Sequence, residues 1–255
     1  MSVENIRQYC KTLKCSHTKN SIEDFLVEAA VENWDAEKTI ETMLARECEA
    51  RRASTIARYE AAAKFPYKMT FSTFQTAHLS AEVIREVRRF STREFIREGA
   101  NAILIGNPGV GKTALSVAIG TAACKAGMRV MFVNVSNLVI RMKEAMSAND
   151  MTRFKRNFER WDLVILDDLG YCSFSKECGE MLFNLLSDRN EGKSIVITTN
   201  LTFERWHEVF GDPILTGCIA DRLTHRAHIV DMTGDSYRIM DTKRWREGMQ
   251  ENHIQ

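Results

Sequence analysis

The chain has 255 residues, of which 44% are hydrophobic and 27% are charged, a composition typical of a soluble globular protein with one α/β domain and a smaller appendage. It has 35 lysines and arginines against 34 aspartates and glutamates, so the formal net charge is +1. The chain is therefore not a polycation, and any affinity for nucleic acid must come from local basic patches.

The cysteines and the apolar segments bear on the compartment. The chain has seven cysteines without a CxxC pair, and Cys10, Cys15 and His17 lack the spacing of a common zinc site, so free thiols in a reducing environment are the simplest interpretation. The amino terminus has no apolar run typical of a signal peptide, and no segment approaches the roughly 20 apolar residues that span a membrane. We therefore expect a cytoplasmic location.

Residues 1–66 are expected to form a small helical amino-terminal domain. Residues 21–64 are rich in Ala, Glu, Arg and Leu and contain neither Gly nor Pro. Ser21, followed by two acids, predicts the start of a helix, and Pro66 predicts the end of the helical region. The mixed charges of residues 46–60 predict a solvated helix face with salt bridges.

Residues 67–255 alternate short apolar runs with helical segments. The expected strands cover residues 102–105, 129–134, 163–167, 194–199 and 227–231. The expected helices cover residues 113–126, 137–146, 151–160 and 176–189. This alternation predicts an α/β domain with a parallel sheet of about five strands flanked by helices on both faces.

Residues 106–113, GNPGVGKT, fit the phosphate-loop pattern GxxxxGK[ST] between a predicted strand and a predicted helix. Glycines let backbone N–H groups turn toward phosphates, and the helix amino terminus adds its positive dipole end. We expect Lys112 to reach the β- and γ-phosphates of ATP and the Thr113 hydroxyl to coordinate Mg²⁺. The residues expected to bind the nucleotide are Gly106, Asn107, Pro108, Gly109, Val110, Gly111, Lys112, Thr113 and Ala114.

Polar residues at the ends of later strands complete the predicted site. Asp167, at the end of the run Leu163–Asp167, is expected to hold the magnesium ion, and Asp168 to orient or deprotonate the attacking water. Asn200 follows the strand at 194–199, and the carboxyl ends of parallel strands open on the same crevice. Asn200 is therefore a candidate to contact the γ-phosphate or the water, although an Asn after a strand is commonly a turn residue.

Two arginines and a basic segment are further candidates. Arg222 and Arg238 are each more often surface residues than catalytic ones, but an arginine can stabilise phosphoryl charge from the same chain or from a neighbour. Basic residues with few acids nearby lie between the second and third predicted strands, where they suit the sugar-phosphate backbone of DNA or, equally, a solvated helix face. The candidate DNA-binding residues are Lys143, Arg153, Lys155 and Arg156, with Arg160 beside them.

Four strings, NAILIGNPGVGKTALSVAIG, LVILDDLGY, ITTNLTFERWHEVFGD and DRLTHRAHIVDMTGDSYR, resemble the IstB-type transposition helper ATPases of bacterial insertion sequences. These are relatives of the DnaC helicase loaders in the AAA+ initiator group, and the resemblance covers about residues 60–240. It implies an AAA+ core in residues 67–255 without a full carboxyl-terminal lid, and ATP bound between subunits. It also implies a spiral or ring of subunits on duplex DNA and delivery of that DNA to a partner transposase.

The same resemblance implies a role for each polar residue. Asp167 and Asp168 match the Walker B motif, Asn200 the sensor I position, Arg222 the arginine finger that reaches a neighbour's site, and Arg238 the sensor II position. Three other readings stay open at this point: a replicative helicase loader, a small-molecule kinase, and a binding module that uses ATP only for structure. The paired aspartates with Asn200 favour water over a small molecule as the phosphoryl acceptor.

Overall fold

The structure, a computed structural model, describes residues 3–187, 189, 192–234, 236, 237, 239 and 242. The chain divides into two compact units, residues 1–58 and residues 59–255, and each is described by itself.

The first unit consists of helices. α1 (Val3–Thr12), α2 (Ser16–Val31) and the first part of α3 (Ala36–Ala63) form it, and apolar residues such as Ile22 and Phe25 are buried between them. The predicted helix start at Ser21 is wrong, because Ser21 lies inside α2. Its hydroxyl donates a hydrogen bond to the carbonyl of His17 one turn earlier (3.0 Å), which satisfies a serine within a helix.

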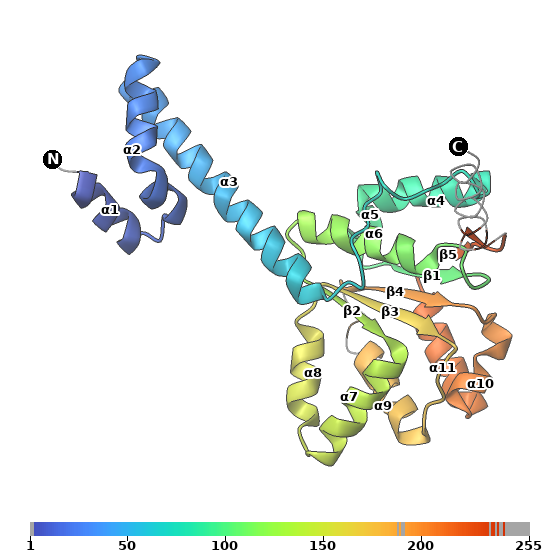
Figure 1. The fold of residues 1–255 in the computed structure, drawn as a ribbon. Helices are drawn as coiled ribbons and strands as arrows, with labels where there is room; N and C mark the ends of the chain where they lie inside the picture. Colours follow the sequence, from blue (N-terminus) through green and yellow to red (C-terminus); the bar gives the residue numbers. More distant parts are fainter. Residues whose placement is uncertain are drawn as a thin grey trace, which may run out of the picture. The chain divides into compact units, whose positions relative to one another are not determined.

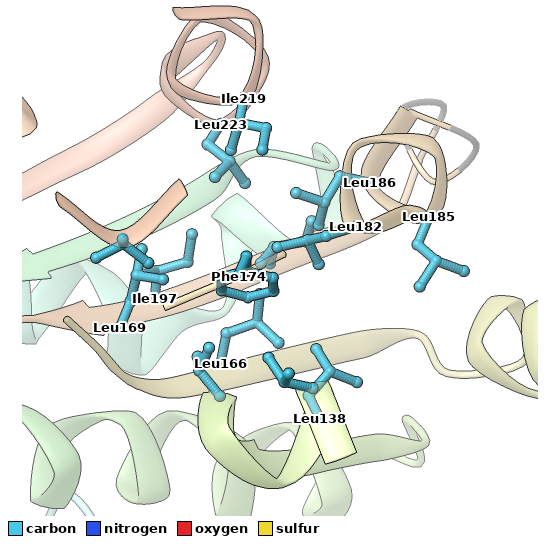
Figure 2. Packing of buried hydrophobic residues seen from close by; sticks show 14 of the residues in the cluster. Leu138, Leu166, Leu169, Phe174, Leu182, Leu185, Leu186, Ile197, Ile219 and Leu223 are labelled. Atoms are coloured by element: carbon cyan, nitrogen blue, oxygen red, sulfur yellow. The ribbon is translucent and has the colours of Figure 1, made fainter. Parts of the chain in front are cut away.

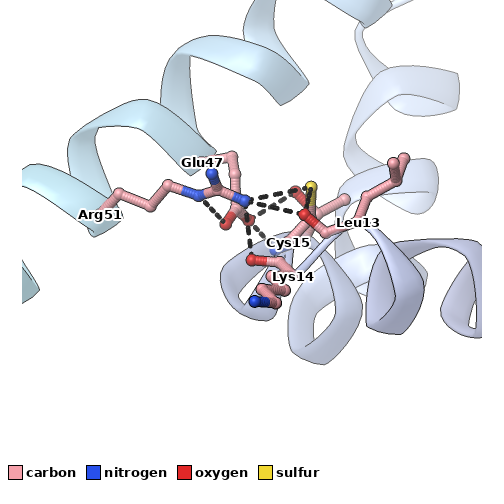
Figure 3. Close-up of polar contacts among 6 residues, drawn as sticks. Leu13, Lys14, Cys15, Glu47 and Arg51 are labelled. Carbon is pink, nitrogen blue, oxygen red and sulfur yellow. Dashed lines mark hydrogen bonds and ion pairs between the residues drawn. The ribbon is translucent and has the colours of Figure 1, made fainter.

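The buried carboxylate of Glu47 joins α3 to the first turn of α2, and Arg51 joins α3 to the turn between α1 and α2 (Figure 3). Glu47 is only 5% exposed and accepts hydrogen bonds from Thr18 N (2.9 Å), Thr18 Oγ1 (3.0 Å) and Arg51 Nε (3.1 Å). Arg51 also donates to the carbonyl oxygens of Leu13 (3.2 Å) and Lys14 (2.7 Å). At Glu47 the expectation of a solvated face is therefore wrong, but the expected salt bridge is present, between Glu47 and Arg51.

The second unit contains a sheet of five parallel strands, which confirms the predicted α/β class. Neighbouring strands follow the order β2-β3-β4-β1-β5. The strands are β1 (Asn101–Ile105), β2 (Val130–Asn134), β3 (Leu163–Leu169), β4 (Ser194–Thr199) and β5 (Ala227–Asp231). Because all strands run in one direction, the polar residues at their carboxyl ends meet at one edge.

Helices cover both faces of the sheet (Figure 1). One face carries α4 (Ala81–Thr92), α5 (Glu94–Arg97) and α6 (Lys112–Lys125). The other face carries α7 (Val135–Ser147), α8 (Met151–Glu159), α9 (Lys176–Ser187), η1 (Phe203–Arg205), α10 (His207–Phe210) and α11 (Pro213–Thr224). Four of these helices, α4, α5, α10 and α11, were not predicted from the sequence.

Apolar side chains fill the layer between the sheet and the second set of helices (Figure 2). Leu166 of β3 and Ile197 of β4 lie among Leu138 of α7, Leu182 of α9 and Leu223 of α11. Each of these side chains is at most 3% exposed. At about 25 cal/mol per Å² of buried apolar area, such a layer is a main source of stability for the second unit.

Within the described residues, no helix has the length and apolar character that crossing a membrane requires. The expectation of no full carboxyl-terminal lid concerns residues after Asp231, most of which lie outside the described residues.

Candidate functional site

The predicted phosphate loop lies between the carboxyl end of β1 and the amino end of α6. Gly111 is the N-cap of α6, with a φ of 101°, a left-handed conformation that residues with a side chain rarely adopt. The N-cap is a glycine, so it has no side chain to accept a hydrogen bond from the first amides of α6. These N–H groups and the positive end of the helix dipole allow the amino terminus of this 14-residue helix to bind an anion.

Lys112 places a cation over the loop. Lys112 is buried, and its Nζ donates hydrogen bonds to the carbonyl oxygens of Gly106 (2.6 Å) and Asn107 (2.8 Å). A buried ammonium needs acceptors, and these carbonyls provide them. The ammonium is therefore held at the mouth of the loop, within reach of an anion bound there.

A cavity of about 430 Å³ opens above the loop. It is lined by Tyr67, Met69, Pro108, Gly109, Gly111, Lys112, Thr113, Ala114, Asp168, Tyr171 and Tyr237. Lys112 and the glycines of the loop give this lining a cation and exposed backbone groups, while Tyr67, Tyr171 and Tyr237 give it aromatic rings. Such a lining suits a ligand with an anionic end and a flat apolar end. Val110, predicted to bind nucleotide, does not line the cavity because its side chain packs into the core, 1% exposed.

Asp167 and Asp168 lie at an irregularity of β3. The pairing of β3 with β4 shifts register between Leu166 and Leu169, and Asp168 has a φ of 61°, a left-handed value unusual for a residue with a side chain. The two consecutive carboxylates therefore do not alternate as in a regular strand. Asp167 is 5% exposed, whereas Asp168 is half-buried and lines the cavity.

Thr198 of β4, which the sequence analysis missed, joins the two acids. Its hydroxyl donates to Asp167 Oδ1 (2.7 Å) and accepts from the Asp168 N–H (2.9 Å). Thr113, the predicted metal ligand of the phosphate loop, also hydrogen-bonds to Asp167. The only signal in the sequence was a polar residue within an apolar strand.

Burial raises the pKa of Asp167 above its ordinary value, and the charge of Asp168 adds to this shift. The hydrogen bonds from Thr198 and Thr113 and the charge of Lys112 oppose it. A buried carboxylate beside a second carboxylate is short of positive charge, which is the environment that a divalent cation stabilises.

Asn134, at the carboxyl end of β2, contacts Asp168 from the other side. Its Nδ2 donates to Asp168 Oδ2 over 3.4 Å, and its Oδ1 accepts from the Ser136 N–H as the N-cap of α7. The sequence analysis did not single out Asn134, because an Asn before a helix has the ordinary role of a cap.

Asn200 follows β4 at the same edge of the sheet, as predicted. Its Oδ1 is buried and accepts no hydrogen bond from the described residues. Gly170, with a φ of 134°, approaches it so closely that an added Cβ would lie 2.5 Å from this oxygen. The loop after β3 and the residue after β4 are therefore packed together without room for a side chain at position 170.

Tyr237 is a further residue that the sequence analysis did not use. Its N–H donates to the carbonyl of Gly109 (3.0 Å), and its ring lies 5.3 Å from that of His78. The His78 Nε2 atom lies 3.4 Å from the carbonyl of Val110. Segments distant in sequence thus support the outer side of the phosphate loop.

Arg222 lies at the opposite edge of the sheet. It occupies the last turn of α11, and one of its Nη atoms donates to the carbonyl of Ser187 at the end of α9 (2.8 Å). α11 leads into the amino end of β5, whereas the phosphate loop follows the carboxyl end of β1, about 15 Å away along strands of this length. Arg222 therefore does not contact the nucleotide cavity of its own chain. Arg238 lies outside the described residues.

The four candidate DNA-binding residues lie on α7 and α8 and are all exposed; they are Lys143, Arg153, Lys155 and Arg156. We call them the α7–α8 cluster. Arg153 lies 3.8 Å from Asp150, so the expectation of few acids nearby does not hold at that residue.

The residues present fit a nucleotide with Mg²⁺. The uncapped helix end and Lys112 supply donors for phosphate oxygens, and the cavity leaves space above them. The Thr113 hydroxyl and the Asp167 carboxylate, hydrogen-bonded to each other, are oxygen ligands of the kind that Mg²⁺ prefers.

Three curated proteins show how far the sequence similarity extends. The insertion sequence IS21 ATP-binding protein of Pseudomonas aeruginosa is 31% identical over 232 residues, 91% of this chain and 88% of that protein. The corresponding protein of IS5376 in Geobacillus stearothermophilus is 29% identical and covers 98% and 99% of the two chains. An insertion sequence ATP-binding protein of Sinorhizobium fredii is 34% identical, over 87% and 76%.

Solved structures share the fold. The crystal structure of DnaI has a TM-score of 0.57 at 22% identity and covers 70% of this chain and 98% of its own. The DnaC helicase loader has a TM-score of 0.53 at 24% identity, with 70% and 99% covered. These likenesses show that the sheet and its helices have the fold of these two proteins.

The sequence pattern of a single family spans nearly the whole chain, residues 8–244. This match includes both the amino-terminal helices and the carboxyl ends of the strands, where the phosphate loop and the two aspartates lie. The chain belongs to the family of IstB-like ATP-binding proteins.

Proposed function

We propose that the chain is an ATP-dependent, DNA-binding regulator of transposition. It assembles on duplex target DNA, delivers that DNA to a partner transposase or activates the transposase, and hydrolyses ATP at the interfaces between subunits. The names of its relatives, which are ATP-binding proteins of insertion sequences, support the transposition context.

The observation that carries the proposal is the convergence of Lys112, Thr113, Asp167, Asp168 and Asn200 at one edge of the sheet. In the proposed site the amides of the phosphate loop and Lys112 bind the phosphates of ATP, while Thr113 and Asp167 hold Mg²⁺. Bound Mg²⁺ would neutralise charge on the phosphate oxygens.

Asp168 is the proposed residue that orients the attacking water and accepts its proton. It lines the cavity, and Asn134 and Thr198 position it through its carboxylate and its N–H. The buried Asn200 Oδ1, which has no donor among the described residues, is free to accept a hydrogen bond from that water.

The position of Arg222 supports hydrolysis between subunits. An arginine at the amino edge of the sheet cannot reach the phosphate loop at the carboxyl edge of the same sheet. If it stabilises the transferred phosphoryl group, it must do so in a neighbouring copy, and one subunit alone would be a poor ATPase.

We expect Arg222→Ala to keep ATP binding and to lose about 1,000-fold in turnover, the order of effect of an arginine finger. Mixing this protein with Lys112→Ala protein should restore part of the activity, because each supplies what the other lacks. ATP turnover of the mixture, compared with each variant alone, is the measurement. Absence of rescue would argue that Arg222 acts within its own chain or only in folding.

The proposal as a whole is tested by measuring ATP hydrolysis and particle size with and without a long random-sequence duplex, in the presence of Mg²⁺. We expect the duplex to raise turnover, and ATP with the duplex to give large assemblies. If the duplex changes neither quantity, the DNA-organising function is wrong and a helicase-loading function becomes the better explanation.

A further inference from the structure

The outward face of α4 carries three arginine side chains that the nucleotide site does not use. Arg85, Arg88 and Arg89 are three and four residues apart, so they lie on one face of the helix, and all three are exposed. We call them the arginine stripe.

The helix that carries the stripe is fixed at both ends and on its inner side. The Ser80 hydroxyl caps it by accepting a hydrogen bond from the Val83 N–H (3.3 Å), and Arg93, in a left-handed conformation, ends it. Val83, Val87 and Phe90 bury the opposite face. The guanidinium groups are therefore presented from a rigid element and not from a mobile loop.

Among the described residues, no carboxylate lies within ion-pair distance of the arginine stripe. Some other arginines are paired, as half-buried Arg46 is with Glu28 at 2.6 Å. The two glutamates of α4 do not pair with these arginines. Glu86 lies 3.5 Å from His228 Nδ1, and Glu82 lies in the first turn, where its charge interacts favourably with the helix dipole. Like charges at this spacing disfavour a helix, so α4 carries an electrostatic cost that an anionic partner would remove.

We propose that the arginine stripe is a second binding surface for the phosphodiester backbone of DNA. Guanidinium groups bind phosphate oxygens in a bidentate way, and the segment 81–97 contains five arginines and no lysine. None of the described residues in 81–97 is an exposed large hydrophobic, whereas a protein partner would need an apolar centre to its interface. The inference rests on the proposed DNA binding.

The stripe is separate from the α7–α8 cluster. α4 packs on the face of the sheet that also carries α6, while α7 and α8 pack on the other face (Figure 1). One subunit therefore presents basic surfaces on two sides, and they bind different stretches of DNA backbone.

The test is the salt dependence of binding to a fluorescent random-sequence duplex, with the full chain, ATP and Mg²⁺. Each phosphate contact contributes about 0.9 to the slope of log affinity against log salt. We expect R85Q/R88Q/R89Q to make the slope shallower by about 2–3. R85K/R88K/R89K should keep most of the slope, since the charges remain, and each single Gln variant should lower it by about 1.

A matched control removes three other exposed charges, K11Q/K125Q/K176Q, and should leave the slope unchanged. Titration with a fluorescent ATP analogue without DNA reports whether each variant is folded, and the single variants are used for the test if the triple variant is not. A folded Gln variant with the wild-type slope would overturn the inference, and the stripe would then be a solvated face or a protein contact.

Failure of the inference is distinguishable from failure of the proposed function. If the wild-type chain does not bind the duplex at all, the DNA-binding function is wrong. If the wild type binds and only R153Q/K155Q/R156Q reduces the slope, the function stands and DNA contact is confined to the α7–α8 cluster.

Discussion

Glu47 in the first unit and Asp167 in the second are each 5% exposed, but Asp167 lies much deeper in the protein, and their pKa values move in opposite directions. Burial acts to raise the pKa of Glu47, but hydrogen bonds from Thr18 and Arg51 outweigh it and lower the pKa. Burial also raises the pKa of Asp167, where the neighbouring charge of Asp168 adds to the effect.

The difference separates a structural acid from a candidate binding site. Glu47 has its charge compensated within the fold, so it needs nothing else. Asp167 has only hydroxyl partners and the like charge of Asp168 beside it, so a bound cation would stabilise its charged form. Equal exposure therefore does not indicate equal roles, because the depth of burial and the partners of each carboxylate decide.

The first prediction tests whether Lys112, near Asp167, binds the phosphates of ATP. Lys112→Ala should reduce ATP affinity by at least about 100-fold, because it removes charge-assisted hydrogen bonds to phosphate oxygens. Titration with a fluorescent ATP analogue is the measurement. Lys125→Ala, at the exposed far end of the same helix, is the matched control and should bind normally. Tight ATP binding by Lys112→Ala would remove the phosphate-loop assignment.

The next prediction tests whether Asp168, the acid beside Asp167, accepts the proton of the attacking water. Asp168→Asn should retain ATP binding and lose about 100- to 10,000-fold in turnover, the range of a missing general base. Single-turnover hydrolysis and nucleotide titration separate the two quantities. Normal turnover in this variant would assign the base to another residue.

Removing the charge of the structural acid should destabilise the first unit. Glu47→Gln keeps the shape but weakens the bonds to Thr18 and Arg51, and we expect a loss of about 1–2 kcal/mol in local unfolding free energy. Faster amide hydrogen exchange in α1 and α2, with exchange in the β-strands unchanged, is the expected result.

The pH dependence at Glu47 follows from the sign of its shift. Its folded pKa is depressed, so its contribution is fully present above the unfolded value of about 4.3 and is lost as the pH falls through the folded pKa. Wild type and Glu47→Gln should therefore approach the same local stability at low pH, and a difference that persists there would contradict this account.

The smallest effect has the opposite sign. Without nucleotide and metal, Asp167→Asn should raise the free energy of unfolding by about 1 kcal/mol, because it removes a buried charge beside Asp168. The gain should vanish as the pH falls through the raised pKa of Asp167, where the wild-type carboxyl becomes neutral. Thermal unfolding measures it, and destabilisation at neutral pH would make Asp167 a structural acid like Glu47.

The sequence by itself determined the local features. The five strands, the helices α6 to α9 and the phosphate loop followed from apolar runs, helix composition and a motif whose glycines need left-handed backbone. These are short-range properties, so they can be read without knowing what packs against them.

Only the tertiary structure decided which polar residues meet. The bulge at Asp168 and the bridging of both acids by Thr198 arise because β3 and β4 pair in parallel, and Asn134 reaches Asp168 because β2 lies beside β3. Likewise, Glu47 is buried because α3 packs on the first turn of α2, and Arg222 is separated from the phosphate loop by the length of the strands. The burial of a residue and its hydrogen-bond partners depend on contacts between segments distant in the chain. Composition and local spacing therefore do not predict them for an individual residue.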